Sequence, residues 1–520
     1  MPSNKASGPS TTVTVAQSRR NTSRYVTCLV LLITVSFIAH LRMSAQSSDL
    51  QATPTSEDKR STPNSESGPA ADSSQQLEIS ARFALGQEPN SAAILNDLAQ
   101  ALHAEGNQLA AMYFWKRAAG LDSSNLKIQL SVAALTADLG DMDSSLKELQ
   151  AILAVDPDFE PALFEMAEVL CRVGDYQKGI EMLQRALTLD PQDAAARLSL
   201  GKALLSLQRY SDASLVMAQY VASHPGDAEA HYLLGASYLG EQQLNDAEEE
   251  FRSAHRISST LPQVNRDLGI ALLREGKAHQ ALPYLDQAVE EDPDNPDAHF
   301  FRLQAYKSLH LTDAANVEVG TISRLKSQQV EKDRISLLVS QAKKLTEANQ
   351  LEAALELYRS ALKIAPHDAN LLYELSVIEG ELGQITAEET DLRQAEREDP
   401  AMAAVHNQLG TVEIGRGRYE EAKRELELAT KASPFYYAAL GNLGVAYARL
   451  GDMQQAVQSF EQATEVNPEY KQGYLNLGLL FASAGDFAKA NQALQRALAI
   501  DPSDQSAANV LNQIKMNTKP

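Results

Sequence analysis

Prolines recur every 34 residues over most of this 520-residue chain, and this period constrains the fold more than any other feature. Pro157, Pro191 and Pro225 show the spacing. It returns in the second half at Pro366, Pro400, Pro434, Pro468 and Pro502. Each proline closes a stretch with apolar residues at helical spacing. A chain that repeats one short unit folds as a solenoid with a continuous core, not as several separate domains.

The segment from Tyr470 to Pro502 shows the unit most clearly. One amphipathic stretch ends at Ala484, Gly485 breaks it, and a second stretch ends at Ile500, which predicts a pair of antiparallel helices. Small residues at position 8 of the unit allow the two helices to approach closely: Gly201, Gly235, Gly269, Gly410, Gly444 and Gly478. Alanine dominates positions 20 and 27, as in Ala213, Ala247, Ala422, Ala456, Ala490, Ala186, Ala288 and Ala497. Position 24 takes a large residue to fill the gap between units: Leu183, Phe251, Leu285, Tyr358, Phe460 and Leu494.

This pattern resembles the tetratricopeptide repeat, a helix–turn–helix unit of 34 residues. The resemblance implies an all-α fold, a right-handed superhelical solenoid of antiparallel helix pairs. Seven repeats fit residues 92–329 and five fit 335–504, with an insertion at 330–334. Residues 77–91 match the second helix of a half-repeat, and residues 505–520 match a capping helix and tail.

Three places depart from the pattern. No Pro or Gly interrupts the chain from Thr321 to Pro366, so we expect longer helices or a bend there, and a boundary between two sub-arrays. Glu388 replaces the expected Ala, which predicts local loosening. Pro283 falls early in a second helix, where it should be tolerated.

The N-terminus has a different composition. Residues 1–24 are basic, and residues 25–41 form an uncharged apolar run that predicts a transmembrane signal anchor. A cleaved signal peptide is the alternative, with the protein secreted or periplasmic. In either case the body lies outside the cytoplasm. Residues 42–76 are rich in Ser, Thr and Pro, which predicts a disordered linker.

The charge is strongly acidic overall, at −22, with 68 acidic and 46 basic residues. The acidity lies in the repeats, since the first 43 residues carry bases and no acids. This balance argues against binding of nucleic acid through its phosphates and favours basic partners.

The resemblance implies that the first helix of each repeat lines a concave groove where peptides or helices bind. A helical wheel directs positions 2, 5, 9, 12 and 13 away from the core. We expect protein partners to contact ten residues: Phe164, Tyr232, Arg266, Phe300, Tyr373, Asn407, Gln408, Asn442, Leu475 and Asn476.

Two specialised groove chemistries of the family can be tested on the sequence. The carboxylate clamp for chaperone C-termini is rejected, because Ile270 and Phe301 stand where two of its polar residues are needed beside Arg266. The second chemistry is a ladder of amide side chains that binds the backbone of a peptide. Gln408, Asn442 and Asn476 share position 6, so they fit such an amide ladder; the alternative is that they serve packing.

Nothing in the sequence indicates an enzyme, a cofactor or a metal site. Catalytic and nucleotide-binding motifs are missing, and His231, His299 and His406, at position 4 of their units, are interpreted as packing residues. Cys28 and Cys171 cannot form a disulfide framework or a Cys-rich zinc site.

The sequence therefore predicts a non-enzymatic, membrane-tethered scaffold that binds protein partners. Two alternatives remain: a structural spacer that self-associates through its ends, and an accessory subunit of an envelope glycosyltransferase or secretion machine.

Overall fold

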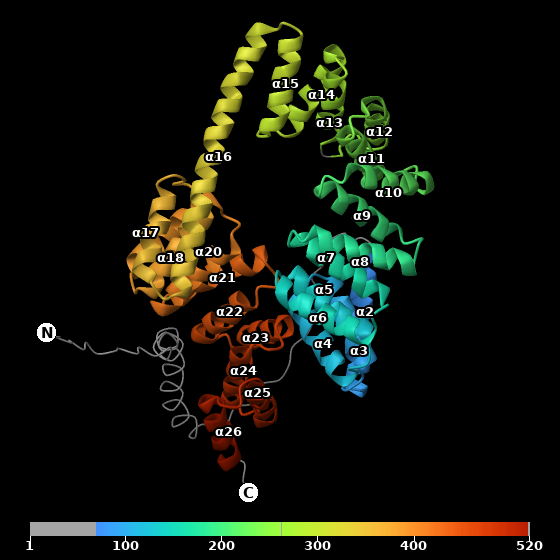
Figure 1. Ribbon diagram of the computed structural model, residues 1–520. Helices are drawn as coiled ribbons and strands as arrows, with labels where there is room; N and C mark the ends of the chain where they lie inside the picture. The colour runs from blue at the N-terminus through green and yellow to red at the C-terminus, as the bar shows by residue number, and fades with distance from the viewer. Residues whose placement is uncertain (1–68, 262, 518–520) are drawn as a thin grey trace, which may run out of the picture. The chain divides into compact units, whose positions relative to one another are not determined.

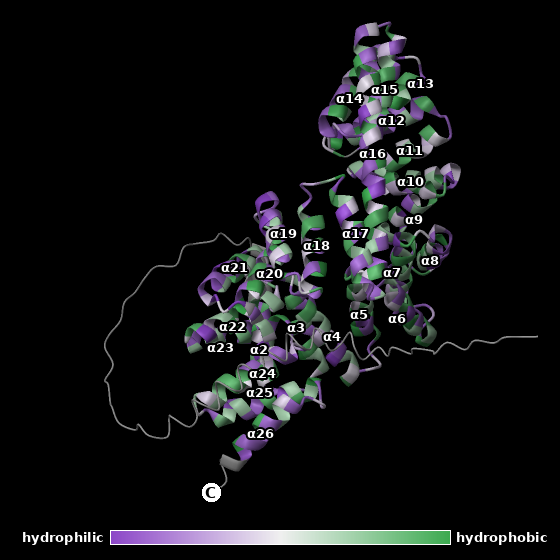
Figure 2. Ribbon diagram, turned by 90° about the vertical axis from the view of Figure 1, so that its left-hand side faces the viewer, coloured by the Kyte–Doolittle hydropathy of each residue, from purple (hydrophilic) through white to green (hydrophobic). Residues whose placement is uncertain are grey.

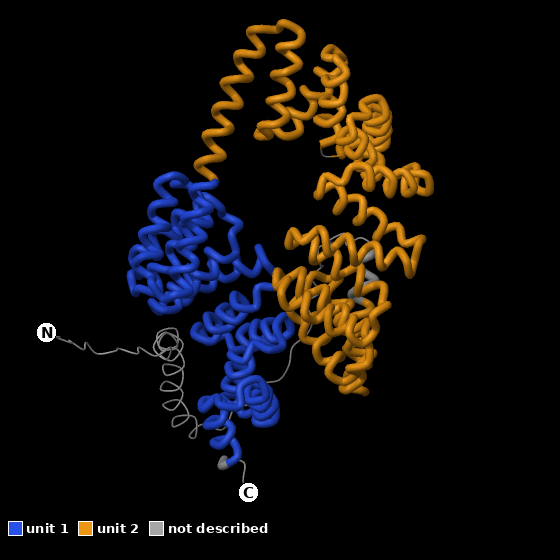
Figure 3. Tube along the Cα trace, viewed as in Figure 1, with its two compact units in different colours: residues 1–73, 333–520 blue, residues 74–332 orange. Residues whose placement is uncertain are grey.

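The computed structural model describes residues 69–517, except residue 262. Within these residues the chain forms 25 helices and no strand (Figure 1). The all-α prediction is thus confirmed for this part of the chain. The described helices group into two compact units: unit 2 comprises residues 74–332, which include most of the first helix, and unit 1 comprises residues 333–517 (Figure 3).

Helices follow one another in pairs that fit the predicted 34-residue frame. Unit 2 contains α2 (Pro69–Gln87) and then the pairs α3 (Ala92–Ala104) with α4 (Gln108–Leu121), α5 (Leu126–Asp138) with α6 (Met142–Val155), α7 (Glu160–Arg172) with α8 (Tyr176–Leu189), α9 (Ala194–Ser206) with α10 (Tyr210–Ser223), α11 (Ala228–Gly240) with α12 (Leu244–Ile257), α13 (Val264–Arg274) with α14 (Ala278–Glu291), and α15 (Pro296–Ser308) with the start of α16 (Thr312–Glu347). Unit 1 continues with the end of α16 and α17 (Leu351–Leu362), α18 (Ala369–Glu381) with α19 (Ile385–Glu398), α20 (Ala403–Gly415) with α21 (Tyr419–Ala432), α22 (Tyr437–Leu450) with α23 (Met453–Val466), α24 (Lys471–Ser483) with α25 (Phe487–Ile500), and α26 (Gln505–Asn517).

The turn inside each pair has a local cause. Between α7 and α8, Gly174 adopts a φ of +84°, which an L-residue with a side chain rarely takes. Asp175 follows it and caps α8 by accepting a hydrogen bond from the backbone N–H of Lys178. The same kind of N-cap begins other second helices, at Asn107, Asp141, Asp452 and Asp486.

The two helices of a pair approach closely because position 8 lacks a side chain. A Cβ atom at Gly444 would lie 2.9 Å from three carbons of the Phe460 ring. At Gly478 a Cβ atom would lie 2.6 Å from Leu494 Cγ. The close approach predicted from the small residue at position 8 is therefore confirmed at these pairs. The large residue at position 24 fills the space opposite position 8 of its own pair, which makes the packing intolerant of larger residues at position 8.

The predicted departures have different outcomes. Glu388 does not loosen its pair: the side chain is 2% exposed and its carboxylate fills the space left by Gly380, where a Cβ atom would lie 2.8 Å from Glu388 Cδ. Gln408 Nε2 donates to Glu388 Oε1 at 2.7 Å, so the buried carboxylate also has a polar partner. Pro283 lies inside α14, which continues to Glu291.

The unbroken run after Thr321 forms one long helix. α16 has 36 residues, and the inserted residues 330–334 lie within it. The helix therefore combines the second helix of the seventh predicted repeat with the first helix of the eighth. The division between the two units falls inside α16, between Lys332 and Asp333.

The predicted N-terminal segments at 1–24 and 25–41 lie outside the described residues, as does most of the linker predicted at 42–76. α2 begins at Pro69, so the last residues of that linker are helical; proline suits the first turn of a helix and alanines follow it. Among the described residues, no helix combines the length and the apolar character required to cross a membrane.

Candidate protein-binding face

The first helices of successive pairs contact one another. In unit 2 such contacts join α5 with α7, α7 with α9, α9 with α11, α11 with α13 and α13 with α15, and in unit 1 they join α20 with α22 and α24 with α26. In most pairs the second helix packs between two first helices, as α10 does against α9 and α11. The first helices therefore form one row from α5 to α15 in unit 2, and two shorter rows, α20 with α22 and α24 with α26, in unit 1. We call the surface made by the outward side chains of the first helices of a unit the first-helix face. Both hydrophobic and hydrophilic segments occur along these helices (Figure 2).

In unit 2 the structure brings together two predicted contact residues, Tyr232 and Arg266, through a shared carboxylate. Tyr232 Oη lies 2.9 Å from Asp267 Oδ2 and 2.8 Å from Gln263 Oε1. Arg266 Nε donates to Asp267 Oδ1 at 2.7 Å. The pKa of Tyr232 is raised mainly by burial and secondly by the negative charge of Asp267. The Tyr232 hydroxyl therefore stays protonated and can donate a hydrogen bond to these oxygens. Both side chains are thus held in fixed positions on the face.

Phe300 is the predicted contact residue that the structure leaves most exposed. Its side chain is 46% exposed, and its ring packs edge-on against Phe301 with the ring centroids 5.3 Å apart. By contrast, Phe164 is half-buried and packs against the core formed by residues such as Ala167 and Ile180. Phe300 is therefore the aromatic side chain of this face that is free to contact a partner.

In unit 1 the predicted amide ladder does not hold its side chains out toward a ligand. Asn442 Nδ2 donates to Asn407 Oδ1 at 2.9 Å and to Thr411 Oγ1 at 3.1 Å. Asn407 Nδ2 donates in turn to Tyr436 Oη at 3.2 Å. Gln408 is bonded to Glu388 as described above. These amides therefore bind one another and their neighbours, which fixes the packing of α20 and α22.

Three predicted contact residues of unit 1 are buried. Leu475 is 2% exposed and packs with Leu479 and Leu494. Asn476 is 6% exposed and accepts a hydrogen bond from Gln472 Nε2 at 3.0 Å, and Asn407 is 9% exposed. The helical wheel placed Asn407 and Leu475 away from the core because it treats a helix as isolated, whereas Leu475 packs with Leu494 of α25 and Leu511 of α26, and Asn407 is bonded to Asn442 of α22. Tyr373 is half-buried, and burial raises its pKa.

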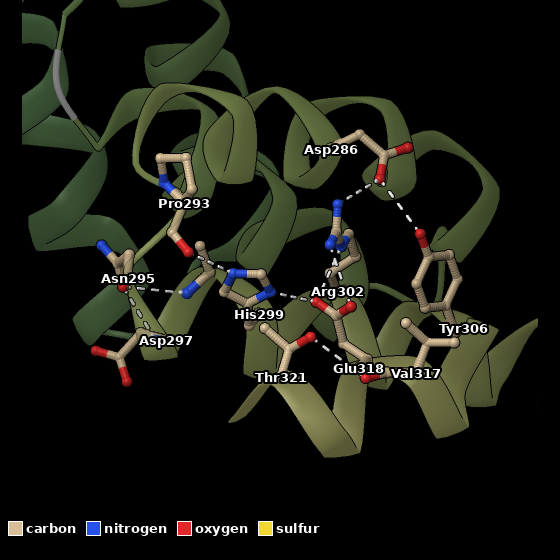
Figure 4. A network of polar contacts seen from close by, with 11 residues as sticks. Asp286, Pro293, Asn295, Asp297, His299, Arg302, Tyr306, Val317, Glu318 and Thr321 are labelled. Carbon is tan, nitrogen blue, oxygen red and sulfur yellow. Dashed lines mark hydrogen bonds and ion pairs between the residues drawn. The ribbon is translucent and has the colours of Figure 1, made fainter. Parts of the chain in front are cut away.

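A recurrent polar contact at position 4 was missed by the sequence reasoning. His299 is 4% exposed; its Nδ1 lies 2.6 Å from Glu318 Oε1 and its Nε2 lies 2.9 Å from the carbonyl oxygen of Pro293 (Figure 4). Arg302 adds two further bonds to the Glu318 carboxylate, at 3.0 and 3.1 Å. These histidines are therefore not plain packing residues: they join the loop before a first helix to the second helix of the same pair.

The same contact occurs in two other pairs. His231 Nδ1 lies 2.5 Å from Glu250 Oε2 and its Nε2 lies 3.1 Å from the Pro225 carbonyl oxygen. In unit 1, His406 makes the matching bonds to Glu425 at 2.9 Å and to Pro400 at 3.0 Å. The sequence does carry the signal, because each histidine has a proline six residues before it and a glutamate nineteen residues after it.

The two contacts of His406 favour its protonated form. The Pro400 carbonyl oxygen and the Glu425 carboxylate both accept, so both ring nitrogens of His406 donate and its imidazole carries a positive charge. At His406 the hydrogen bond to Glu425 raises the pKa of the imidazole above its ordinary value, against the effect of burial. Burial opposes ionisation of Glu425, but its bonds to His406 and Arg393 hold its pKa below the ordinary value.

Glu396, His406 and Glu425 offer ligand atoms within 4.8 Å of one another, as a metal site would. However, His406 uses both ring nitrogens, and Arg393 Nη1 lies 3.0 Å from Glu396 and 2.5 Å from Glu425. The guanidinium thus supplies the positive charge that a metal would bring. The residues fit a network of ion pairs and not a metal centre.

Comparison with known proteins agrees with the helix pattern. Two family models, both described as tetratricopeptide repeat, match the chain: one at residues 170–237, 238–305 and 272–329, and the other at residues 136–194, 407–462 and 450–505. No curated protein matches the sequence.

Several solved structures are similar. MamA (residues 41 to the end) from Desulfovibrio magneticus RS-1 is 24% identical over 33% of this chain and 97% of its own, with a TM-score of 0.32. The Cut9–Hcn1 hetero-tetramer of APC/C matches at 15% identity over 85% of this chain and 93% of that chain, with a TM-score of 0.35. Yeast Tom70 matches at 14% identity over 82% of this chain and 95% of its own, with a TM-score of 0.31. Because the two family models together match more than half of the residues, and the helices pair in the same frame, the chain belongs to the tetratricopeptide repeat family.

Proposed function

We propose that this chain is a non-enzymatic scaffold that binds protein partners on the first-helix face of unit 2. The observation that carries the proposal is Phe300, an aromatic side chain that is 46% exposed at position 5 of a first helix. Aromatic residues at the centre of an interface often supply most of its binding energy. Tyr232 and Arg266, at the same position of two preceding pairs, extend the surface with fixed polar groups.

Unit 1 is the weaker candidate for the partner site. Three of its predicted contact residues are buried, Asn442 is bonded to Asn407, Gln408 is bonded to Glu388, and Tyr373 is half-buried. A ligand would have to break these bonds before it could form its own, which lowers the net gain from each contact.

Affinity capture from solubilised membranes, with the full chain as bait, tests the proposal. We compare two variants, each of which removes one exposed apolar side chain. Phe300→Ala changes the first-helix face, whereas Leu215→Ala changes α10, a second helix of the same unit, at a residue that is 64% exposed. We expect Phe300→Ala to weaken capture of the main partner about tenfold, a typical loss at a binding hot spot, and Leu215→Ala to leave it unchanged. Capture that depends on Leu215 and not on Phe300 would move the site to the second helices.

The acidic composition of the chain supports partners with basic segments. Under this proposal, capture weakens as the salt concentration rises from about 0.05 to 0.5 M, because exposed charges are screened over shorter distances. Capture that is insensitive to salt would favour apolar contacts alone.

The membrane tether is a proposal that rests on the sequence, namely the uncharged run at 25–41 with Arg19, Arg20 and Arg24 before it. A reporter that is active only outside the cytoplasm, fused after residue 520, tests it. Activity with the full chain, and loss of activity when residues 25–41 are deleted, is the expected result. An active cytoplasmic reporter would contradict the proposed topology.

A further inference from the structure

Two acidic side chains meet in the contact between α18 and α19, inside unit 1. Glu379 of α18 occupies position 11 of its repeat, a core position that is at most 5% exposed at Leu102, Leu170, Leu204 and Leu272. Glu379 is as deeply buried, at 2% exposed, and it forms a hydrogen bond with the half-buried Asp391 of α19. A pair of carboxyl groups thus lies where the array elsewhere places an apolar side chain.

A hydrogen bond between two carboxyl groups requires a proton. An ionised carboxylate only accepts, so one of the two groups must be protonated in order to donate. Burial raises the pKa of Glu379 to about 7, and the negative charge of Asp391 and the bond to it act in the same direction. Burial also raises the pKa of Asp391, but its bond with Glu379 opposes that shift. Glu379 is therefore the donor and Asp391 the acceptor.

The second oxygen of Glu379 is the one placed to hold this proton. Glu379 Oε1 accepts a hydrogen bond from Arg359 Nη2 of α17 at 3.3 Å. Glu379 Oε2 is buried, and no donor among the described residues reaches it. A buried oxygen without a donor is costly when it is charged and acceptable when it carries a proton that it can donate.

Arg359 is the cation that acts on both carboxyl groups, and it compensates them only in part. Its side chain is 42% exposed, so water screens its charge. Arg359 Nη1 also donates to Glu356 Oε1 at 3.2 Å, so the same guanidinium serves a third carboxylate. Loss of the shared proton would therefore leave two negative charges side by side with less than one full positive charge to balance them.

The neighbouring helices bring further charged groups toward α18 and α19, but these are paired with other side chains. Lys343 of α16 pairs with Glu374 of α18 at 3.4 Å. The remaining groups pair with Glu389 or Arg393 of α19, and they are Glu413 and Arg416 of α20 and Glu425 of α21. The protonation of Glu379 and Asp391 is thus governed by these two side chains and Arg359.

We propose that Glu379 and Asp391 form a proton-sharing pair that makes the contact between α18 and α19 sensitive to pH. The pair holds the two helices together while it keeps its proton. When the proton leaves, the hydrogen bond is lost and the two carboxylates repel each other, which loosens α18 from α19. The proposal adds a regulatory element to unit 1 and is independent of the partner site at Phe300, which lies in unit 2.

The direction of the pH response follows from proton binding. A carboxyl group of an opened chain loses its proton near pH 4.3, whereas the folded pair keeps its proton until about pH 7. Between these values the folded chain binds more protons than the opened chain. Opening therefore becomes easier as pH rises, by up to about tenfold per pH unit, and stops changing once the folded pair is ionised.

Native-state hydrogen exchange of the full chain tests the proposal, with each rate corrected for intrinsic exchange at that pH. Between about pH 5.5 and about pH 8, the opening constant of α18 and α19 should rise at least about tenfold more in the unaltered chain than in Glu379→Gln, whose amide donates to Asp391 at every pH. Glu381→Gln is the matched control, because it removes a carboxylate from an exposed position of the same helix and should respond to pH as the unaltered chain does. An equal pH response in Glu379→Gln and in the unaltered chain overturns the proposal.

Asp391→Asn tests whether the two carboxyl groups act as a pair, and it keeps the proposal testable if Glu379→Gln fails to fold. Without the negative charge beside it, Glu379 holds its proton less tightly, and the new amide can donate to the ionised carboxylate. We expect the midpoint of the pH response to move down by roughly one pH unit. An unchanged midpoint would show that Glu379 titrates alone and would overturn the pair.

Discussion

Two neighbouring parts of unit 1 have the same fold but different interiors. In α18–α21 the buried side chains include Glu379, Glu388, His406 and Glu413, all at most 3% exposed. In α22–α25, within the part of the chain that the structure describes, every buried side chain is uncharged. We refer to these parts as the charged pairs and the apolar pairs. The comparison shows that the 34-residue frame requires a filled interior but does not require that the filling be apolar.

The two interiors respond differently to change. The charged pairs join helices through charged contacts, such as the hydrogen bond from Arg393 to Glu425 and the ion pair of Arg418 with Glu413, both at 2.5 Å. A buried ion pair adds little to the net stability of the fold. Removal of one of its two residues is nevertheless costly, because the charge of the other residue stays buried without an opposite charge beside it. The apolar pairs depend on shape, as in the contact of Gly444 with Phe460, and their stability should not depend on pH near neutrality.

The largest effect is expected from Gly444→Val in the apolar pairs. A Cβ atom there already falls 2.9 Å from the Phe460 ring, and two further methyl groups would force α22 and α23 apart. We expect a loss of about 3 kcal/mol in the opening free energy of these helices, measured by native-state hydrogen exchange. Gly415→Ala in α20 is the control, because nothing lies within 4 Å of its added Cβ atom.

A smaller effect is expected from Arg393→Ala in the charged pairs. This change leaves Glu425 and Glu413 without their shared cation, and we expect a loss of about 2 kcal/mol, since the guanidinium is partly exposed. Arg424→Ala removes a surface pair with Glu421 and should cost less than about 0.5 kcal/mol. Equal losses in the two variants would mean that the buried network is unimportant.

His406→Gln should change the pH dependence of the charged pairs. The folded-state pKa of His406 is raised, so its bonds stabilise the fold fully below the unfolded pKa of about 6.5, and this contribution is lost as pH rises through the folded pKa. We expect the variant to lose about 1 kcal/mol at pH 6 and less at higher pH. His367→Gln, at a histidine whose side chain is 75% exposed, is the control variant measured over the same pH range. A loss that is independent of pH would contradict the charged form of His406.

The smallest effect is expected from Glu388→Gln. Burial raises the pKa of Glu388, so the ionised carboxylate is disfavoured in the folded state as pH rises. A neutral amide of the same shape keeps the bond from Gln408 and should stabilise α18 and α19 by about 0.5 kcal/mol at neutral pH. Thermal unfolding followed at pH 5 and pH 8 measures the difference. Destabilisation at pH 8 would show that the charge itself is needed.

The sequence predicted the fold well because the repeat signal is local. Glycine at position 8 and alanine at position 20 determine how closely two helices pack, and both can be read from one unit, as at Gly444 and Ala456. The unbroken run after Thr321 likewise predicted the long helix α16.

The candidate site was predicted less well because it depends on neighbouring units. A wheel for one helix placed Leu475 on the surface, and the amide ladder placed Asn476 there, but both are buried, and Leu475 packs with residues of α25 and α26. The contacts of His299 and His406 join residues nineteen positions apart, so they appear only when both helices of a pair are considered together. The exposure of Phe300 likewise depends on its neighbours in space, although its position in the repeat could be read from the sequence.

Hydrogen exchange of the full chain with and without its captured partner tests the central claim most directly. If the first-helix face of unit 2 binds the partner, the amides of α11, α13 and α15 should exchange more slowly in the complex, with the strongest protection around Phe300. The amides of α10, α12 and α14 should change little. Protection confined to these second helices would contradict the account.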